Sequence, residues 1–532
     1  MELRLGYGNP MTPASRNNLL HTAAVSTAVG LLVVTFLKLV WACDDSYIVF
    51  RSVEQFVAGH GPRWNPYERV QVFTSPAWYF VLVLFRAASS NVFLNVVTAS
   101  AIATTLALAS LRRLAGNAGT WLTAVAVLLG SNAFFDYTSS GLENPLCYAA
   151  LALWLIALKR VAEAHRGSRA EVLTAGRWLL SLSAWVLLCR LDLVTLIAIP
   201  TIVAFERIRA DIPGRQWVVA SLPGLLPFIA WQMFALVYYG TPFPNPAYAK
   251  LATGIPHAAL WQHGLWYLAE NARRDPESTV VITAAIVLLG RSRRGILRAV
   301  GAGIAIHVVY VVAVGGDFML GRFLASAMFV SAAGLVWYAH SLSTRSAWRV
   351  LAPIGGAAMV YAFAFVHTPA NSPVGWTALP PHPHGVADER GVYARASLWA
   401  YVHRGGARTF PDIRWAREGL ALRESGGCCA VRWSVGYFGY YAGIDKRIID
   451  LFALCDPLLA RLPANVSGQW RVGHYVRRVP RGYVESVWNG NRNVIADPDY
   501  RAFDNRVRLL TQSKTLFSRR RFAQITSMLT GR

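Results

Sequence analysis

Eleven apolar runs separated by short polar loops constrain the fold of this chain more than any other feature. They cover residues 20–41, 91–111, 119–135, 144–158, 175–188, 191–206, 216–238, 279–290, 297–315, 322–340 and 349–367. A helix that crosses a bilayer needs about 20 mostly apolar residues, and about 17 is the usual lower bound. Several runs are shorter, so their spans must include polar flanking residues. The sequence therefore predicts a mainly α, polytopic membrane bundle of about eleven transmembrane helices.

The composition agrees with a membrane protein. Apolar residues make up 54% of the 532 residues and charged residues only 15%, whereas soluble proteins carry about 25% charged residues. These values exclude a disordered chain, an ordinary soluble enzyme and a nucleic-acid-binding domain. The net charge of +24 fits cytoplasmic loops beside anionic lipids, and nucleic acid is not expected as a partner.

Basic residues predict the orientation in the membrane. They cluster in five short loops, at residues 112–113, 159–177, 207–215, 291–298 and 345–349. All five lie on one side if the N-terminus is cytoplasmic and eleven helices cross. The segment 78–88 would reverse this arrangement if it spanned, but it is short and contains Arg86. We therefore expect segment 78–88 to form a half-buried helix at the membrane surface.

Two domains are predicted. Residues 1–367 form the transmembrane domain, in which the outer loop 43–75 carries an acidic motif, and residues 368–532 form a domain outside the cytoplasm. A helical pattern at 391–404 and alternating runs at 430–435 and 447–450 predict a small mixed α/β fold for this second domain. Its neighbouring Cys428 and Cys429 are poorly placed to pair with each other, but either could join Cys455.

The strongest local motif is a pair of carboxylates directly after the first apolar run, Asp44 and Asp45. A carboxylate at the edge of a bilayer loses hydration, which raises its pKa towards that of a useful general base. The alternative is that both residues cap the next short helix. The dipeptide alone does not decide between these interpretations.

A longer set of motifs extends this pattern. In the first outer loop they are Asp-Asp-x-Tyr-Ile-x-x-Arg at 44–51, Gly-His-Gly at 59–61, Trp-Asn-Pro-x-Glu-Arg-Val at 64–70 and Thr-Ser-Pro-x-Trp at 74–78. Later motifs lie at 140–145, 190–192, 245–250, 315–322, 388–390, 450–463 and 473–475. Together they resemble the GT-C glycosyltransferases, most of all the terminal arabinofuranosyltransferases of mycobacteria and their bacterial relatives. One departure is Leu191, where that family often has Pro.

The resemblance implies a GT-C fold and a membrane glycosyltransferase. Such an enzyme would move a sugar, D-arabinofuranose in the most similar family, from a polyprenyl-phosphate donor to a cell-envelope glycan or glycoprotein. Transfer would be inverting, with Asp44 or Asp45 as the base. Because phosphate is a stable leaving group, cations at the phosphate are needed and a strong acid is not.

Candidate substrate-binding residues follow from these motifs. Lys250 and Arg322 are the first candidates for the donor phosphate, and Arg390 and His474 are the second. The alternatives are interfacial snorkelling for Lys250 and pairing with Asp317 for Arg322. We expect Glu143 and Asp192 to hold acceptor hydroxyls or to orient basic residues.

No metal site and no cofactor are firmly implied. His382 and His384 stand in a Pro-rich stretch with no carboxylate nearby, and no phosphate-binding loop or dinucleotide fingerprint occurs. A transporter or flippase of lipid-linked sugar is the alternative function. Such proteins often show internal repeats and charges in mid-membrane, whereas here no repeat is found and the acidic residues lie at helix ends.

Overall fold

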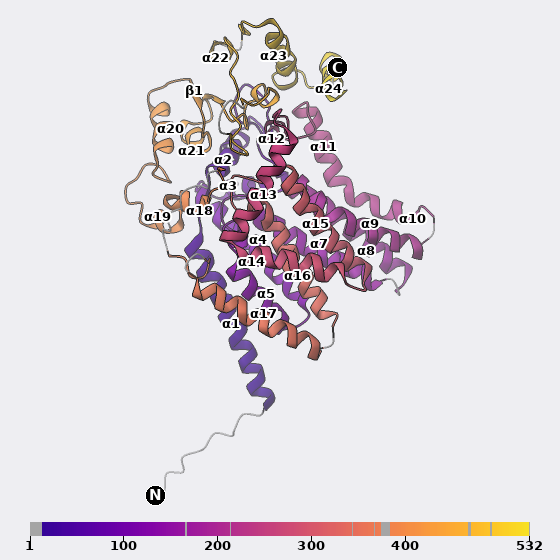
Figure 1. The fold of residues 1–532 in the computed structure, drawn as a ribbon. Helices are drawn as coiled ribbons and strands as arrows, with labels where there is room; N and C mark the ends of the chain where they lie inside the picture. The colour runs from indigo at the N-terminus through magenta and orange to yellow at the C-terminus, as the bar shows by residue number, and fades with distance from the viewer. Residues whose placement is uncertain are drawn as a thin grey trace.

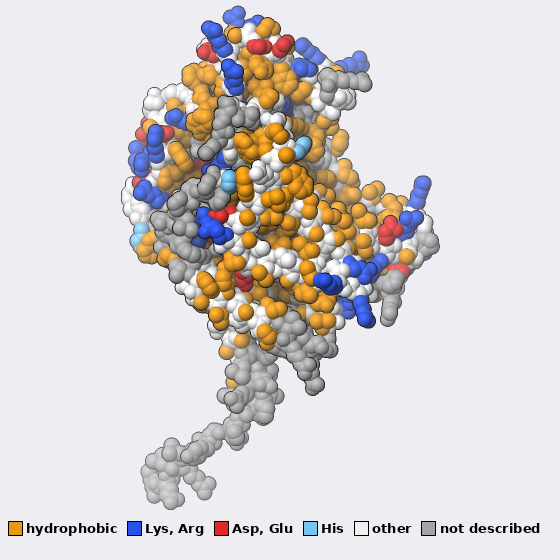
Figure 2. Space-filling model, in the orientation of Figure 1, with side chains coloured by type: hydrophobic (Ala, Val, Ile, Leu, Met, Phe, Trp, Pro, Cys, Tyr) orange, Lys and Arg blue, Asp and Glu red, His pale blue; other side chains and the backbone are white. Residues whose placement is uncertain are grey.

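The computed structural model describes residues 13–164, 167–212, 214–342, 344–365, 368–373, 384–465, 470–489 and 492–530. Long helices pack side by side, and most of the C-terminal segment gathers over the end of the bundle away from the N-terminus (Figure 1). Apolar side chains cover much of the bundle in the view of Figure 2, and many Lys and Arg side chains lie towards its edges. The predicted domain boundary after residue 367 and the candidate His382 lie outside the described residues.

The bundle consists of helices at the predicted apolar runs, together with α13 (His257–Arg274), which lies in none of these runs. Their bounds are α1 Pro13–Leu39, α4 Val92–Ala115, α5 Ala118–Gly130, α7 Asn144–Ala164, α8 Arg169–Cys189, α9 Val194–Asp211, α10 Gln216–Ser221, α11 Leu226–Tyr238, α13 His257–Arg274, α14 Pro276–Gly290, α15 Gly295–Ala313, α16 Arg322–His340 and α17 Thr344–Ala364. Within the described residues, seven helices are long and apolar enough to cross a membrane, and four shorter apolar helices accompany them. The predicted polytopic helical fold is confirmed, while the number of eleven spans stays a prediction.

Four further short helices accompany the bundle: α2 Asp44–Val57, α3 Pro76–Ala88, α6 Asn132–Phe135 and α12 Asn245–Leu251. Ser75 caps α3, because its side chain accepts a hydrogen bond from the Trp78 backbone N–H. Arg86 of α3 pairs with Glu54 of α2 at 2.6 Å. Segment 78–88 therefore forms a short helix attached to α2, and its depth in the membrane stays a prediction.

The C-terminal segment is a small mixed α/β structure. Its elements are α18 Glu389–Val392, α19 Leu398–Val402, α20 Arg414–Glu424, β1 Cys429–Arg432, α21 Gly436–Ala442, β2 Arg447–Asp450, α22 Tyr483–Trp488, α23 Pro498–Thr511 and α24 Arg519–Thr530. Strands β1 and β2 pair in parallel, in the register Cys429–Arg447 to Arg432–Asp450. The predicted strands are confirmed, and the predicted helix at 391–404 is interrupted by a 3-10 turn at residues 394–396.

One cysteine prediction was wrong. Cys428 and Cys429 form a disulfide with each other, although adjacent cysteines were expected to pair poorly. Cys455 is instead a free thiol and is buried, so its expected bond to this pair does not form.

The C-terminal segment packs directly on the start of α2. The Leu398 backbone N–H donates to the Val40 carbonyl at 3.0 Å, and the ring centroids of Tyr47 and Tyr437 lie 4.4 Å apart. The Ala387 N–H donates to the Phe318 carbonyl in the α15–α16 loop at 2.8 Å. These contacts bring the start of α2, the α15–α16 loop and the C-terminal segment together.

Candidate active site

The two neighbouring aspartates at the start of α2 have different environments. Asp44 is 7% exposed, and its carboxylate accepts hydrogen bonds from the backbone N–H groups of Gly436 (3.1 Å) and Tyr437 (2.8 Å). It therefore caps α21, an element 392 residues further along the chain. Burial raises the pKa of Asp44 to about 7, although these two hydrogen bonds favour the charged form.

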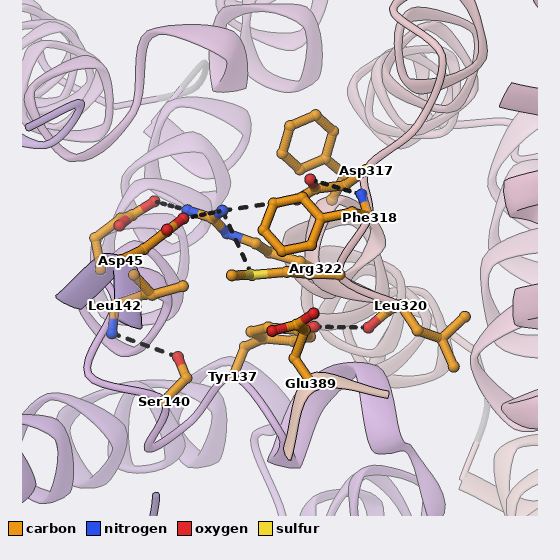
Figure 3. Close-up of polar contacts among 12 residues, drawn as sticks. Asp45, Tyr137, Ser140, Leu142, Asp317, Phe318, Leu320, Arg322 and Glu389 are labelled. Atoms are coloured by element: carbon orange, nitrogen blue, oxygen red, sulfur yellow. Dashed lines mark hydrogen bonds and ion pairs between the residues drawn. The ribbon is translucent and has the colours of Figure 1, made fainter. Parts of the chain in front are cut away.

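Asp45 points in another direction, because successive helical residues diverge by about 100°. Its Oδ2 atom lies 3.9 Å from Arg322 Nη1, and Figure 3 shows the two side chains facing each other. No hydrogen bond to its carboxylate from any described residue is found. Burial raises the pKa of Asp45, while the positive charges of Arg322 and Lys250 oppose that shift. A carboxylate without hydrogen-bond donors is available to accept a proton.

Arg322 lies among three carboxylates at the first residue of α16. Its guanidinium nitrogens lie 3.6 Å from Glu143 Oε1, 3.6 Å from Asp317 Oδ2 and 3.9 Å from Asp45 Oδ2. All three distances exceed those of direct hydrogen bonds, and the buried Nε has no partner among the described residues. The predicted pairing with Asp317 exists only as this longer contact, and the guanidinium retains N–H donors for a ligand.

A glycine permits this placement of Arg322. Gly321 has a φ of +78°, a left-handed conformation that favours glycine. A Cβ atom on Gly321 would also lie 3.1 Å from the Ala133 Cβ. The loop therefore turns tightly and places Arg322 at the first residue of α16.

Arg190 joins two of the predicted acidic residues. Its Nη1 donates to Glu143 Oε1 at 2.7 Å, and its Nε and Nη2 donate to the two oxygens of Asp192 at 2.9 and 2.6 Å. Burial raises the pKa of Glu143, but Arg190 and Arg322 more than offset this and hold it below its usual value. Glu143 thus stays charged and links the two arginines.

Arg190 was not among the binding residues predicted from the sequence. The available signal was the Arg-Leu-Asp motif itself, in which two opposite charges lie two residues apart. The bidentate pair with Asp192 fits the expectation that an acidic residue orients a basic one. Leu191 at the position where the similar family often has Pro does not prevent this pair.

Lys250 lies in the last turn of α12, which begins after Pro244. Its ammonium forms no hydrogen bond or ion pair with any residue that the structure describes. Together with Arg190 and Arg322 it lines a cavity of about 310 Å³. The remaining lining includes the apolar or aromatic side chains of Leu191, Phe243, Leu251, Tyr310, Val314 and Phe323. The cavity thus combines three cations and the carboxylates of Asp192 and Asp317 with an apolar wall.

Two of the candidate phosphate-binding residues lie outside this cavity. Arg390 donates to Asp136 Oδ1 at 2.7 Å, which attaches α18 to the loop after α6. His474 packs between the rings of Phe318 and Phe452, with centroids 4.1 and 4.5 Å away. Burial, followed by the charges of Arg471 and Lys250, lowers the pKa of His474 to about 3. A neutral imidazole adds no positive charge for a phosphate.

No group of three or more His, Cys, Asp or Glu side chains suited to a metal ion occurs among the described residues. His384, one of the two histidines considered for a metal, stacks on Trp266 with the ring centroids 3.4 Å apart. Its predicted companion His382 is not described.

Two named glycosyltransferases are similar in sequence to this chain, although no protein-family model matches it. The terminal beta-(1->2)-arabinofuranosyltransferase of Mycobacterium tuberculosis is 25% identical over 551 residues, covering 84% of this chain and 85% of that protein. The predicted family resemblance is confirmed. The protein of the same name from Corynebacterium glutamicum is 28% identical over 327 residues, covering 54% of this chain. That match spans 46% of the Corynebacterium protein, or about half of its length. Glycosyltransferase is the enzyme class that these relatives indicate.

Two solved structures also align with the fold. One is ArnT from Cupriavidus metallidurans bound to undecaprenyl phosphate, with 14% identity, a TM-score of 0.42, and coverage of 79% of this chain and 74% of that chain. The other is the arabinosyltransferase EmbB from Mycobacterium smegmatis, with 15% identity, a TM-score of 0.34, and coverage of 80% and 44%. Both scores lie below 0.5, so the assignment of residues to roles depends on the geometry described above.

Proposed function

We propose that this protein transfers D-arabinofuranose from a polyprenyl-phosphate donor to a hydroxyl group of an envelope glycan or glycoprotein. The observation that carries the proposal is the position of Asp45, a carboxylate without hydrogen-bond donors, beside a cavity lined by three cations. Asp45 also lines a small pocket together with Lys250 and Arg322. A base and a phosphate site are therefore adjacent, as a glycosyl transfer from a phosphate requires.

The cation-lined cavity suits the donor. Lys250 and Arg322 have N–H donors that the protein leaves unused, and Arg190 adds a third positive charge. These groups would bind the phosphate and stabilise the negative charge that grows on it as the glycosidic bond breaks. The apolar wall formed by Phe243, Leu251 and other side chains suits the first isoprene units of the lipid.

The chemical step needs one base. Asp45 accepts the proton of the acceptor hydroxyl, whose oxygen forms a bond to the anomeric carbon. The bond from that carbon to the phosphate oxygen breaks, and the electron pair leaves with the phosphate, so the anomeric configuration inverts. Because burial raises the pKa of Asp45, this carboxylate is a stronger base than an exposed one.

Asp45 is a better candidate for the base than Asp44. Both oxygens of Asp44 accept backbone hydrogen bonds from α21, which assigns to Asp44 the role of holding the tail on α2. The proposal places the site on the outer face of a bacterial inner membrane, with the N-terminus in the cytoplasm. That orientation rests on the five basic loops.

Reconstitution tests this function against the flippase alternative. The full chain is placed in liposomes with radiolabelled polyprenyl-phosphoryl arabinofuranose and an arabinofuranosyl oligosaccharide. Transfer of label to the oligosaccharide is expected for the wild type, and the Asp45→Asn variant should lose it. Asp412→Asn is the matched control, because Asp412 is 53% exposed and pairs only with the surface residue Arg417 among the described residues. Movement of label across the bilayer without transfer would contradict the proposal.

A further inference from the structure

A second, narrow cleft is also lined by Asp45 and shares no lining residue with the cation-lined cavity. Its walls come from three parts of the chain that are distant in sequence: α2 with Asp45, the α15–α16 loop with Phe318, and the tail with Glu389, Trp433, Phe452 and His474. The space inside is about 30 Å³. This is enough for a hydroxyl or water-sized group, which needs at least about 10–15 Å³, and too small for a sugar ring.

A row of aromatic rings leads from the interior of the cleft to its mouth. Phe318 contacts His474 edge to face, His474 contacts Phe452, and the Phe452 and Trp433 centroids lie 5.5 Å apart. Trp433 is 50% exposed, whereas His474 is half-buried. The row therefore ends in a large aromatic surface that no other part of the described chain covers completely.

Most polar groups in this cleft already have partners. Asp44 accepts from the backbone of α21, and Asp450 accepts from the backbone N–H groups of Phe452 and Cys455 at 2.9 Å each. Glu389 accepts from Arg471 Nη2 at 3.0 Å. These contacts stabilise the walls of the cleft.

Asp45 and His474 are two of the remaining polar groups in the cleft. Asp45 has no hydrogen-bond donor, and the buried His474 Nδ1 has no hydrogen-bond partner among the described residues. A buried nitrogen without a partner destabilises the folded protein, and such groups are rare in folded proteins. His474 lines the cleft together with Asp45, so a ligand that enters the cleft lies beside both residues.

We propose that this cleft binds the acceptor, with its terminal sugar ring stacked on Trp433 and its reacting hydroxyl inserted between His474 and Asp45. This inference rests on the proposed function and adds to it the place from which the acceptor enters. The apolar C–H face of a sugar packs on the negative face of the indole ring. His474 hydrogen-bonds to the hydroxyl or its neighbour, and the limited space admits the hydroxyl but not the ring.

The arrangement also separates the two substrates. The donor phosphate lies with Lys250 and Arg322, the acceptor approaches past the tail, and Asp45 lines both the small pocket with the cations and the cleft. The nucleophile and the leaving group thus reach the anomeric carbon from different sides, as inversion requires. The tail would then determine which acceptor the enzyme uses.

Direct binding tests the inference without requiring turnover. An arabinofuranosyl oligosaccharide is titrated into the full-length protein in detergent, and its dissociation constant is compared between wild type, Trp433→Ala, Trp433→Phe, His474→Phe and His474→Asn. Loss of the stacking surface in Trp433→Ala should weaken binding about tenfold, and Trp433→Phe should recover part of it. His474→Phe should weaken binding several-fold, and His474→Asn, which keeps a donor and an acceptor, should weaken it less.

Two controls define the outcome. Trp399→Ala removes another exposed tryptophan, 57% exposed on α19, and should leave the oligosaccharide affinity unchanged. Binding of polyprenyl phosphate, measured separately, should be retained in Trp433→Ala. Wild-type oligosaccharide affinity in both Trp433→Ala and His474→Phe would overturn the inference, as would a wild-type protein that binds no oligosaccharide. Binding in the cleft without any sugar transfer would instead contradict the proposed function.

Discussion

The carboxylate of Asp45 lies 3.9 Å from the guanidinium of Arg322, close enough for attraction but beyond a hydrogen bond. A direct bond would lower the basicity of the carboxylate and occupy the donors of the arginine. At this separation both groups keep their capacity for a substrate. Arg322 lies at a similar distance, 3.6 Å, from the carboxylates of Glu143 and Asp317. The site is therefore charged, but none of these carboxylates forms a direct hydrogen bond with Arg322.

The two aspartates should respond differently to the same substitution. Asp45→Asn removes the proposed base and should lower the transfer rate about 10²–10⁴-fold while the protein folds normally. In Asp44→Asn one amide N–H would face a backbone N–H of α21, so the main effect should be a lower unfolding temperature. Transfer assays and thermal unfolding of both variants measure this. A rate for Asp45→Asn above roughly a tenth of wild type would contradict its role as base and make Glu143 the next candidate.

This difference between neighbours shows what the sequence could and could not predict. Apolar runs need only local information, so the helical bundle was predictable, as were the strands at 429–432 and 447–450. The partner of Asp44 lies in α21, and only the folded chain shows that this carboxylate is already occupied. Arg190 was missed for the same reason, because its bond to Glu143 joins residues 47 positions apart.

Lys250 and Arg322 should contribute to both donor binding and rate. Lys250→Ala and Arg322→Ala should each lower transfer about 10²-fold, since both stabilise charge on the leaving phosphate, and should weaken binding of polyprenyl phosphate. The matched controls are Lys514→Ala, an exposed lysine in the tail, and Arg417→Ala, a surface arginine. Unchanged turnover in Lys250→Ala would favour the snorkelling interpretation of that residue.

Glu143 should act as a positioning residue for both arginines. Glu143→Gln keeps the shape but loses the charge that holds Arg190 at 2.7 Å and attracts Arg322. We expect a loss in rate between about tenfold and 10²-fold, because small displacements of phosphate-binding groups are costly. Glu418→Gln, at an exposed pair with Arg414, is the control. Similar losses of unfolding temperature and activity in both variants would indicate a structural role only.

The orientation in the membrane can be tested with reporter fusions. A reporter active only outside the cytoplasm should be active after Arg532 and inactive after Arg113, since the positive-inside rule places the 112–113 loop in the cytoplasm. Arg113 lies in the last turn of α4, which ends at Ala115, so the second fusion falls at the end of that helix. The reverse pattern of activity would place the proposed site in the cytoplasm and contradict an external acceptor.

The burial of Asp44 predicts a pH dependence of stability with a definite sign. Its pKa is raised from 3.8 in the unfolded chain to about 7 in the folded protein. The folded state therefore binds the proton more tightly, and the stabilisation that this gives is fully present below about pH 4 and is lost as the pH rises through about 7. Other buried carboxyls act in the same direction, so the wild type must be compared with Asp44→Asn. Between about pH 4 and 7 the unfolding temperature of the wild type should fall relative to that of Asp44→Asn. Above that range the difference between the two should stay constant. A difference that does not vary with pH would mean that Asp44 keeps an ordinary pKa, in which case its hydrogen bonds from α21 outweigh its burial.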